Sequence, residues 1–321
     1  MGPGTLSRRT AMVSSLRLVM VSCGIATVAV LIACARGRAE NSPDESTAAG
    51  TASERTLHIK PRYYRWHVDP GEEWVEKNTG YAHLDWEVTL SRVALVLVDV
   101  WDRHYIEDTE SRSEEIVQQK IRPLLNASRQ AGVEIIHAPS PREARLYKAW
   151  NQQRYPVQES SLRVPQPAAK SELTWPPVEF RSKAGPYKKY ARPFEPMAAV
   201  RLERLKGMRI HPDVEPVGDE VVVANGAELH QYCREKGILF LIYLGFNTNA
   251  CILTRDYGTL EMGKRGYEII ILRDCTTAME SFETADELLQ TRGAIQFLEM
   301  FGKYSITSQE LIAGLPDSSD E

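Results

Sequence analysis

The sequence has few cysteines, no excess of basic charge and no internal repeat. It carries 39 Lys+Arg against 43 Asp+Glu, a formal net charge of -4, so no global basic field exists to bind a nucleic-acid backbone. Five cysteines in 321 residues do not support a disulfide scaffold, and 20 Gly with 18 Pro are close to average usage. The absence of a heptad pattern excludes a coiled coil. We therefore expect an ordinary globular protein that binds no nucleic acid.

The first 38 residues lack Asp, Glu and Lys but contain five arginines. Within them, residues 18–33 form an apolar run that is short for a membrane span and adequate for the core of a secretory signal. The run ends in Leu31-Ile32-Ala33-Cys34, which resembles the lipobox of bacterial lipoproteins, whose cysteine is lipidated. We therefore expect a signal peptide over 1–33 and a membrane-anchored lipoprotein of the cell envelope, in the periplasm or on the outer face. An uncleaved anchor and an ordinary cleaved signal are the alternatives.

Residues 34–56 are predicted to be a disordered tether, because residues 40–54 are acidic, rich in small residues and without a large apolar side chain. Cleavage before Cys34 would remove Arg8, Arg9 and Arg17, leaving 39 − 3 = 36 basic residues against 43 acidic ones, or -7. The folded domain is expected over 57–321.

Short β-branched runs alternate with amphipathic stretches from Leu57 onwards, which is typical of an α/β domain. We predict a three-layer α/β/α fold with a doubly wound, mainly parallel sheet. The expected strands are 93–99, 133–137, 220–224, 239–245, 267–273 and a short edge strand 304–306, and the expected helices are 113–131, 226–236, 249–264 and 283–300. Residues 139–216 are irregular and rich in Pro, aromatic and basic residues, and a stretch of that kind is usually a functional lid or an inserted cap.

Candidate chemistry lies where the expected strands end, because ligands bind at the carboxyl ends of parallel strands. Asp99 ends the first of these strands, His137 the second, and Cys251 follows the fourth in the first turn of a helix. A helix amino terminus favours the thiolate, Asp99 could accept its proton, and turn amides could bind an oxyanion. The alternative is that Cys251 is a small buried residue and Asp99 an ordinary cap.

Three segments, Ala94–Asp99, Gly245–Cys251 and Gly266–Thr277, resemble the isochorismatase-like cysteine hydrolase superfamily, which includes nicotinamidases and other amidases. The resemblance implies Asp99 as acid and base, Cys251 as nucleophile, a cis peptide bond between Phe246 and Asn247, and an oxyanion hole made of the Asn247 and Cys251 N–H groups. It implies no cofactor.

The lysine of the family triad has no counterpart at its usual place, where this chain reads Val222-Val-Ala-Asn225-Gly226. Asn225 could contribute only a hydrogen bond. Lys183, Lys188 or Lys189 of the insertion could supply the charge, although a solvated basic loop is the favoured interpretation of these three.

Aromatic and histidine side chains near Asp99 are the expected walls of a substrate pocket. They are Trp101, His104, Tyr105, His137 and Phe246, with core packing equally plausible for Trp101 and Tyr105. Nicotinamidases carry a metal after their second strand, but this chain has no ligand set at 138–142, so no metal is expected. The remaining cysteines, Cys233 and Cys275, are expected in the core, with pairing as the alternative, and His211 and His230 at the surface or as caps.

The sequence predicts a hydrolase that cleaves a carbon–nitrogen bond of a small amide-like molecule through a thioester at Cys251. A non-catalytic small-molecule-binding protein on the same fold is the alternative if no cation reaches Asp99 and Cys251. A vinyl-ether hydrolase, which needs no thiol nucleophile, is a third hypothesis. A homo-oligomer is left open.

Overall fold

The computed structural model describes residues 55–150 and 175–316. The predicted signal peptide, Cys34 and all but the last two residues of the predicted tether lie outside the described residues. Residues Thr51–Glu321 form one compact unit. None of the helices within the described ranges is long and apolar enough to cross a membrane.

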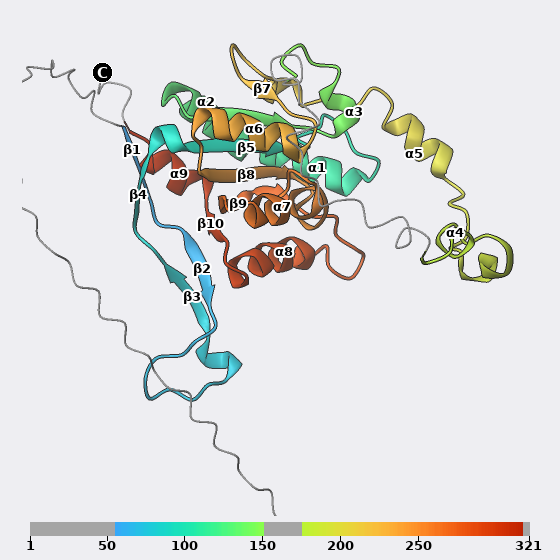
Figure 1. The fold of residues 1–321 in the computed structure, drawn as a ribbon, viewed down its shortest axis with the longest axis horizontal. Helices are drawn as coiled ribbons and strands as arrows, with labels where there is room; N and C mark the ends of the chain where they lie inside the picture. The colour runs from blue at the N-terminus through green and yellow to red at the C-terminus, as the bar shows by residue number, and fades with distance from the viewer. Residues whose placement is uncertain (1–54, 151–174, 317–321) are drawn as a thin grey trace, which may run out of the picture. The chain divides into compact units, whose positions relative to one another are not determined.

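The unit is built on an eight-stranded sheet with the order β3-β2-β10-β9-β8-β5-β6-β7 (Figure 1). Neighbours from β10 through β9, β8, β5 and β6 to β7 are parallel, whereas β2 and β3 are antiparallel additions at the β10 edge. The strands of this sheet are β2 (Arg62–Arg65), β3 (Gly80–His83), β5 (Val93–Val98), β6 (Glu134–Ala138), β7 (Val221–Val222), β8 (Phe240–Phe246), β9 (Glu268–Thr277) and β10 (Tyr304–Ile306). The predicted α/β architecture with a mainly parallel sheet is confirmed.

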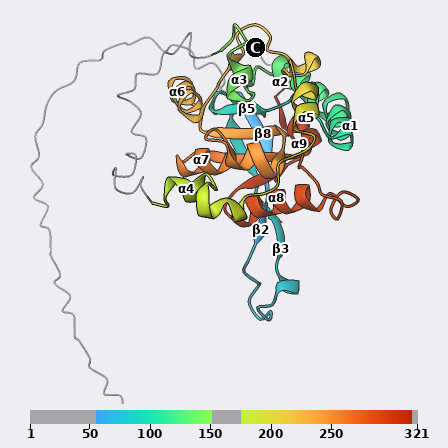
Figure 2. The ribbon, with the colours of Figure 1, turned by 90° about the vertical axis from the view of Figure 1, so that its right-hand side faces the viewer.

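Helices cover both faces of the sheet, which gives three layers (Figure 2). One face packs on α1 (Glu107–Ile116), the π-helical turn η3 (Val117–Ile121), α2 (Arg122–Gln130) and α9 (Ser308–Gly314), and the other on α6 (Gly226–Lys236), α7 (Thr259–Lys264) and α8 (Leu289–Met300). Successive residues of β5 alternate between the two apolar clusters, Leu95 and Leu97 joining one and Val96 and Val98 the other. The continuous apolar run at β5 therefore reflects burial on both faces.

Two predicted helix boundaries are wrong for local reasons. The helix expected to begin at residue 113 begins at Glu107, where three acidic residues in the first turn complement the helix dipole. It widens into η3 just before Pro123, which lacks an N–H. The last long helix begins at Leu289 rather than 283, because Leu288 has a left-handed backbone with φ 52°.

The helix expected over 249–264 is also wrong in its continuity. The structure has a π-helical turn, η9 (Thr248–Ile252), and a separate α7, with the chain turning between them. A side chain at Gly258 would meet the Ile252 carbonyl oxygen at 2.7 Å, so the chain folds back on itself too closely for a continuous helix.

Several elements had no counterpart in the sequence prediction, and others match it closely. The unpredicted ones include the small sheet of β1 (Thr56–Ile59) and β4 (Trp86–Thr89), the hairpin β2–β3 and short helices α3 (Pro141–Ala144), α4 (Val178–Arg181) and α5 (Ala198–Arg204) within the insertion. By contrast, α6 and β10 coincide with their predicted ranges. Thr307 caps α9 through a reciprocal bond with Glu310.

Candidate active site

The candidate site lies where β5 and β8, adjacent and parallel, end. Asp99 directly follows β5, and Cys251 lies on η9 directly after β8. Gly245 pairs with Val98 and has φ 112°, and a Cβ there would be 1.9 Å from the Val98 carbonyl oxygen. Only glycine therefore allows β8 to lie this close to the end of β5.

Three side chains converge on the Asp99 carboxylate. It accepts a hydrogen bond from Ser140 Oγ at 3.1 Å, Arg255 Nη2 lies 3.6 Å from its Oδ2, and the Cys251 thiol is close enough for the two groups to shift each other's pKa. Asp99 is 5% exposed, whereas Cys251 is half-buried. An acid, a thiol and a cation therefore lie together at a partly buried position.

Arg255 supplies the cation that the sequence analysis could not place. It lies one helical turn beyond Cys251, and its backbone N–H donates to the Cys251 backbone carbonyl at 3.2 Å. The following turn is fixed because the Gly226 N–H donates to Asp256 Oδ2 at 3.0 Å and the Tyr257 hydroxyl donates to the Pro139 carbonyl at 3.1 Å. The spacing of four residues between Cys251 and Arg255 places both side chains on one helix face. This spacing was the sequence signal from which Arg255 could have been identified.

Asn225 stands where the family lysine was expected, and it caps α6. Its Oδ1 accepts from the Glu228 N–H at 2.9 Å, and the buried Glu228 carboxylate also accepts from the Ala224 N–H and Trp150 Nε1. Within the insertion, Lys183 Nζ lies 3.8 Å from the centre of the Phe180 ring. Among the ion pairs of the described residues, none joins the insertion lysines to Asp99.

Burial sets the protonation of the pair. Burial raises the pKa of Asp99, while hydrogen bonds from Cys251 and Ser140 and the charge of Arg255 lower it. Burial and the neighbouring Asp99 raise the pKa of Cys251 to about 11, with Arg255 acting in the opposite direction. The helix-end argument from the sequence favoured a thiolate, and these two effects outweigh it. Cys251 is thus a thiol near neutral pH and must lose its proton to become a nucleophile.

The loop between β8 and Cys251 has the predicted cis peptide bond between Phe246 and Asn247. The Asn247 carbonyl accepts from the Ala250 and Ile252 N–H groups at 3.1 and 3.2 Å, so η9 is wound tightly onto the end of the strand. Asn247 is 7% exposed, and its Oδ1 has no hydrogen-bond partner among the described residues. Both proposed oxyanion-hole amides lie on this one loop.

Aromatic rings stack beside the loop. Phe246 lies 4.9 Å from Trp101, Trp101 lies 5.0 Å from His104, and His104 lies 4.5 Å from Tyr105, measured between ring centres. Trp101 and Asp99 also line a small cavity of ≈ 10 Å³. The other side chains around this cavity are Val100, Pro139, Ser140, Glu143, Met208, Arg209 and Ile210.

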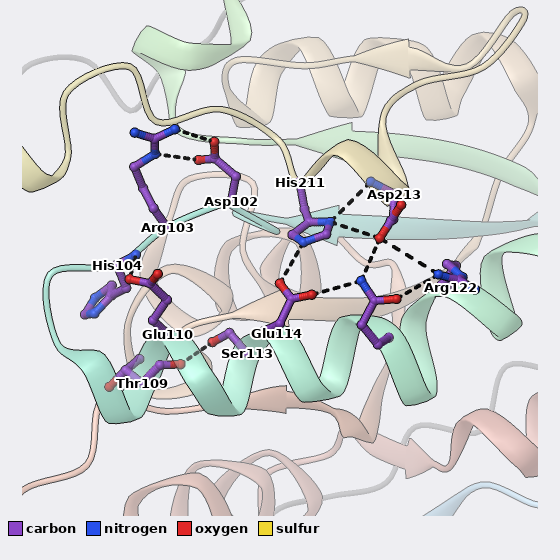
Figure 3. Close-up of polar contacts among 11 residues, drawn as sticks. Asp102, Arg103, His104, Thr109, Glu110, Ser113, Glu114, Arg122, His211 and Asp213 are labelled. Atoms are coloured by element: carbon purple, nitrogen blue, oxygen red, sulfur yellow. Dashed lines mark hydrogen bonds and ion pairs between the residues drawn. The ribbon is translucent and has the colours of Figure 1, made fainter.

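The returning end of the insertion is fixed against α1 and the loop after β5 (Figure 3). His211 Nε2 lies 2.8 Å from Glu114 Oε2 on α1, and the Arg209 N–H donates to Asp102 Oδ1 at 3.1 Å. The His104 N–H donates to Glu110 at 3.1 Å, and burial lowers the pKa of His104. The end of the insertion held in this way includes Met208, Arg209 and Ile210, which form one wall of the cavity beside Asp99.

His137 is brought to a different neighbour. Its side chain is buried, with Nε2 2.8 Å from Glu220 Oε2, and Glu220 also pairs with Arg129 Nε at 2.7 Å. Burial opposes ionisation of Glu220, but the hydrogen bonds from His137 and Arg129 lower its pKa to about 2. Arg129 and Glu220 also line an open hollow of ≈ 580 Å³ with Glu134, at the amino end of β6. This larger hollow is at the opposite edge of the sheet from Asp99.

The other candidate ligands and thiols lie away from the pair. Within the described residues, no group of three or more His, Cys, Asp or Glu side chains could hold a metal ion. Cys233 and Cys275 are buried free thiols. His230 Nδ1 contacts the Tyr267 hydroxyl at 2.8 Å, and His211 caps the turn before Asp213.

Comparison with known proteins yields a family match and similar solved structures. Residues 93–298 match the model of the isochorismatase domain. A cysteine hydrolase from Pseudomonas syringae pv. phaseolicola is 18% identical, with 72% of this chain and 95% of that chain covered and a TM-score of 0.43. An N-carbamoylsarcosine amidase from Thermoplasma acidophilum is 15% identical, with 68% and 96% covered and a TM-score of 0.36. No curated protein matches the chain. Because the family model spans well over half of the sequence, including Asp99 and Cys251, the chain belongs to the isochorismatase domain family of hydrolases.

Proposed function

We propose that this protein hydrolyses an amide-type carbon–nitrogen bond of a small molecule through a thioester at Cys251. The observation that carries the proposal is the contact of the Asp99 carboxylate with both the Cys251 thiol and the Arg255 guanidinium. These groups provide a base, a nucleophile and a positive charge in one partly desolvated place.

In the first half-reaction, the Cys251 thiol transfers its proton to Asp99 while the sulfur attacks the substrate carbonyl carbon. The N–H groups of Asn247 and Cys251 donate to the oxygen of the tetrahedral intermediate. Protonated Asp99 gives its proton to the departing amine, the carbon–nitrogen bond breaks, and a thioester remains on Cys251. Arg255 stabilises negative charge as it moves between the sulfur and the carboxylate.

In the second half-reaction, Asp99 accepts a proton from water as the water oxygen attacks the thioester carbon. The carbon–sulfur bond then breaks, the proton returns to the sulfur, and the carboxylic acid leaves. A buried carboxylate can perform both proton transfers because burial raises its pKa toward the working pH.

The side chains around the cavity beside Asp99 indicate the chemistry of the proposed substrate. The space that they leave is ≈ 10 Å³, enough for about one water molecule. Its walls combine the apolar Trp101, Met208 and Ile210 with the polar Ser140 and Glu143. This lining suits a short chain that carries one amide group.

The direct test measures ammonia release from a panel of small primary amides and carbamoyl compounds. We expect turnover by the natural protein, an acyl adduct on Cys251 in quenched samples by intact mass, and loss of turnover in Cys251→Ser. Cys233→Ser, which changes a buried thiol outside the site, is the matched control and should retain turnover. A Cys251→Ser protein that hydrolyses its substrate at the natural rate would exclude the thioester.

The alternative of a non-catalytic binding protein depended on the absence of a cation at Asp99. Arg255 lies at that position, so the hydrolase has the stronger support. If equilibrium dialysis showed binding of a panel compound while neither ammonia nor an adduct formed, the binding protein would be favoured instead.

We also propose that the chain is exported and anchored through lipidated Cys34, on the strength of the apolar run and lipobox-like tetrapeptide in its sequence. Growth of expressing bacteria with an alkyne-tagged fatty acid should label the natural chain and leave Cys34→Ala unlabelled. Equal labelling of both chains would contradict this assignment.

A further inference from the structure

Residues 175–194 of the insertion form a short, self-packed segment with an unusual composition. The segment contains α4 and the 3-10 helix η7 (Gly185–Tyr190), drawn in yellow-green in Figure 1. The Phe180 and Tyr187 rings meet edge to face at 5.2 Å, and the Ala184 N–H donates to the Glu179 carbonyl at 2.8 Å. These contacts give the segment a defined local shape.

The apolar side chains of this segment face water. Phe194 is 84% exposed, Trp175 76%, Val178 63% and Tyr190 58%. A single exposed apolar residue needs no explanation, but several within twenty residues of chain mark a surface that binds something.

Basic residues accompany these apolar side chains. The segment has five Lys or Arg and one Glu, a charge of 5 − 1 = +4, in a chain whose formal charge is -4. The five cations are Arg181, Lys183, Lys188, Lys189 and Arg192. The ammonium groups of Lys183 and Lys189 lie 3.8 and 5.1 Å from the centres of the Phe180 and Tyr190 rings. Cationic and aromatic groups therefore lie beside each other at two places in the segment.

We propose that residues 175–194 bind the anionic headgroup surface of a lipid bilayer. Trp and Tyr rings prefer the boundary between headgroups and acyl chains, and Lys and Arg are attracted to anionic lipids. The aliphatic Val178 and the strongly exposed Phe194 suit contact with the apolar side of this boundary.

The proposal is independent of the chemistry at Cys251 and agrees with the lipid anchor proposed at Cys34. Residues 175–194 would be a second contact with the membrane and would hold the domain against the same bilayer.

The first test is amide hydrogen exchange of the full chain, read by mass spectrometry with and without vesicles. Vesicles that contain phosphatidylglycerol should slow exchange within 175–194, and pure phosphatidylcholine vesicles should do so much less. High salt should weaken the protection, because it screens the charges. Unchanged exchange in 175–194 with anionic vesicles would overturn the proposal, as would protection by a single-stranded oligonucleotide but not by vesicles.

The second test compares variants of the full chain, so that the amino-terminal segment contributes equally to all of them. The double variant Lys188→Glu/Lys189→Glu should lower binding to anionic vesicles by about tenfold or more, and Trp175→Ser/Phe194→Ser should weaken it on both vesicle types. Matched controls on the β2–β3 hairpin are Lys77→Glu and Trp74→Ser; both residues are exposed, Trp74 to 74%. Control variants that lose as much binding as the segment variants would refute the assignment.

Discussion

Arg255 is expected to control the reactivity of Cys251, and Arg255→Met tests this. At the observed 3.6 Å between Arg255 Nη2 and Asp99 Oδ2, opposite unit charges attract by about 4–5 kcal/mol at an effective dielectric constant of about 20, and by about 1 kcal/mol in water. Because the Arg255 side chain is 35% exposed, solvent screening reduces the effect to about 2 kcal/mol. The same guanidinium lowers the pKa of Cys251, so we apply this magnitude to the thiolate.

A loss of about 2 kcal/mol raises the pKa of Cys251 by about one to one and a half units. Below its pKa, the thiolate fraction of Cys251 then falls by about 10- to 30-fold. The assay is the second-order rate of iodoacetamide alkylation between pH 7 and 10, followed on the Cys251 peptide by mass spectrometry. Arg255→Lys should retain most of the natural rate, because it keeps the charge while losing the guanidinium fork.

Two controls separate electrostatics from unfolding. Arg265→Met removes an exposed arginine ten residues further along and should leave the rate unchanged. The buried Cys233 and Cys275 should stay unlabelled in every variant, because their labelling reports an opened core. An Arg255→Met protein with a natural melting temperature and the natural pH profile of alkylation would refute the role given to Arg255.

Three further predictions concern the pair and its scaffold. Asp99→Asn removes a negative charge that raises the pKa of Cys251, so alkylation of Cys251 at pH 8 should become faster by about tenfold. Amide turnover should fall at least about 100-fold, because the general base is lost. Slower alkylation would contradict the predicted effect of Asp99 on the pKa of Cys251. Gly245→Ala should lower the free energy of unfolding by about 3 kcal/mol or more, because its Cβ would overlap the Val98 carbonyl, whereas Gly71→Ala, at φ 94° in open space, should cost much less in the same denaturant titration. The depressed pKa of Glu220, from 4.5 to about 2, stabilises the fold fully above pH 4.5 and progressively less as the pH falls toward 2. The destabilisation caused by Glu220→Gln should therefore be about 2–3 kcal/mol at pH 7 and shrink at pH 3, and an equal destabilisation at both pH values would show that Glu220 acts only through packing.

Elements with strong local signals could be predicted from the sequence. The apolar run of β5 and the helix α6, which Asn225 and Gly237 cap, carry their boundaries in their own residues. The positions of Asp99 and Cys251 followed from parallel strand order, since adjacent parallel strands end at one edge of the sheet.

Contacts between distant segments could not be predicted in this way. Ser140 and Asp99 are 41 residues apart, and neither residue has a local pattern that indicates the other. His137 is likewise directed to Glu220, 83 residues away, by the face of β6 on which it lies. The antiparallel strands β1–β4 are each only four residues long, so their periodicity is too short to distinguish them from loops.

The sequence alone thus determined the sheet class and the placement of Asp99 and Cys251 at the ends of neighbouring strands, because periodicity, caps and chain order are properties of neighbouring residues. Only the tertiary structure decided which cation serves them. Arg255 reaches Asp99 because the chain turns after Ile252 and Gly226 packs against Asp256, and a side-chain meeting of that kind depends on how three separate segments pack. The protonation of Cys251 was also decided by the tertiary structure. Burial and Asp99 raise the pKa of Cys251, whereas a helix amino terminus by itself would favour the thiolate.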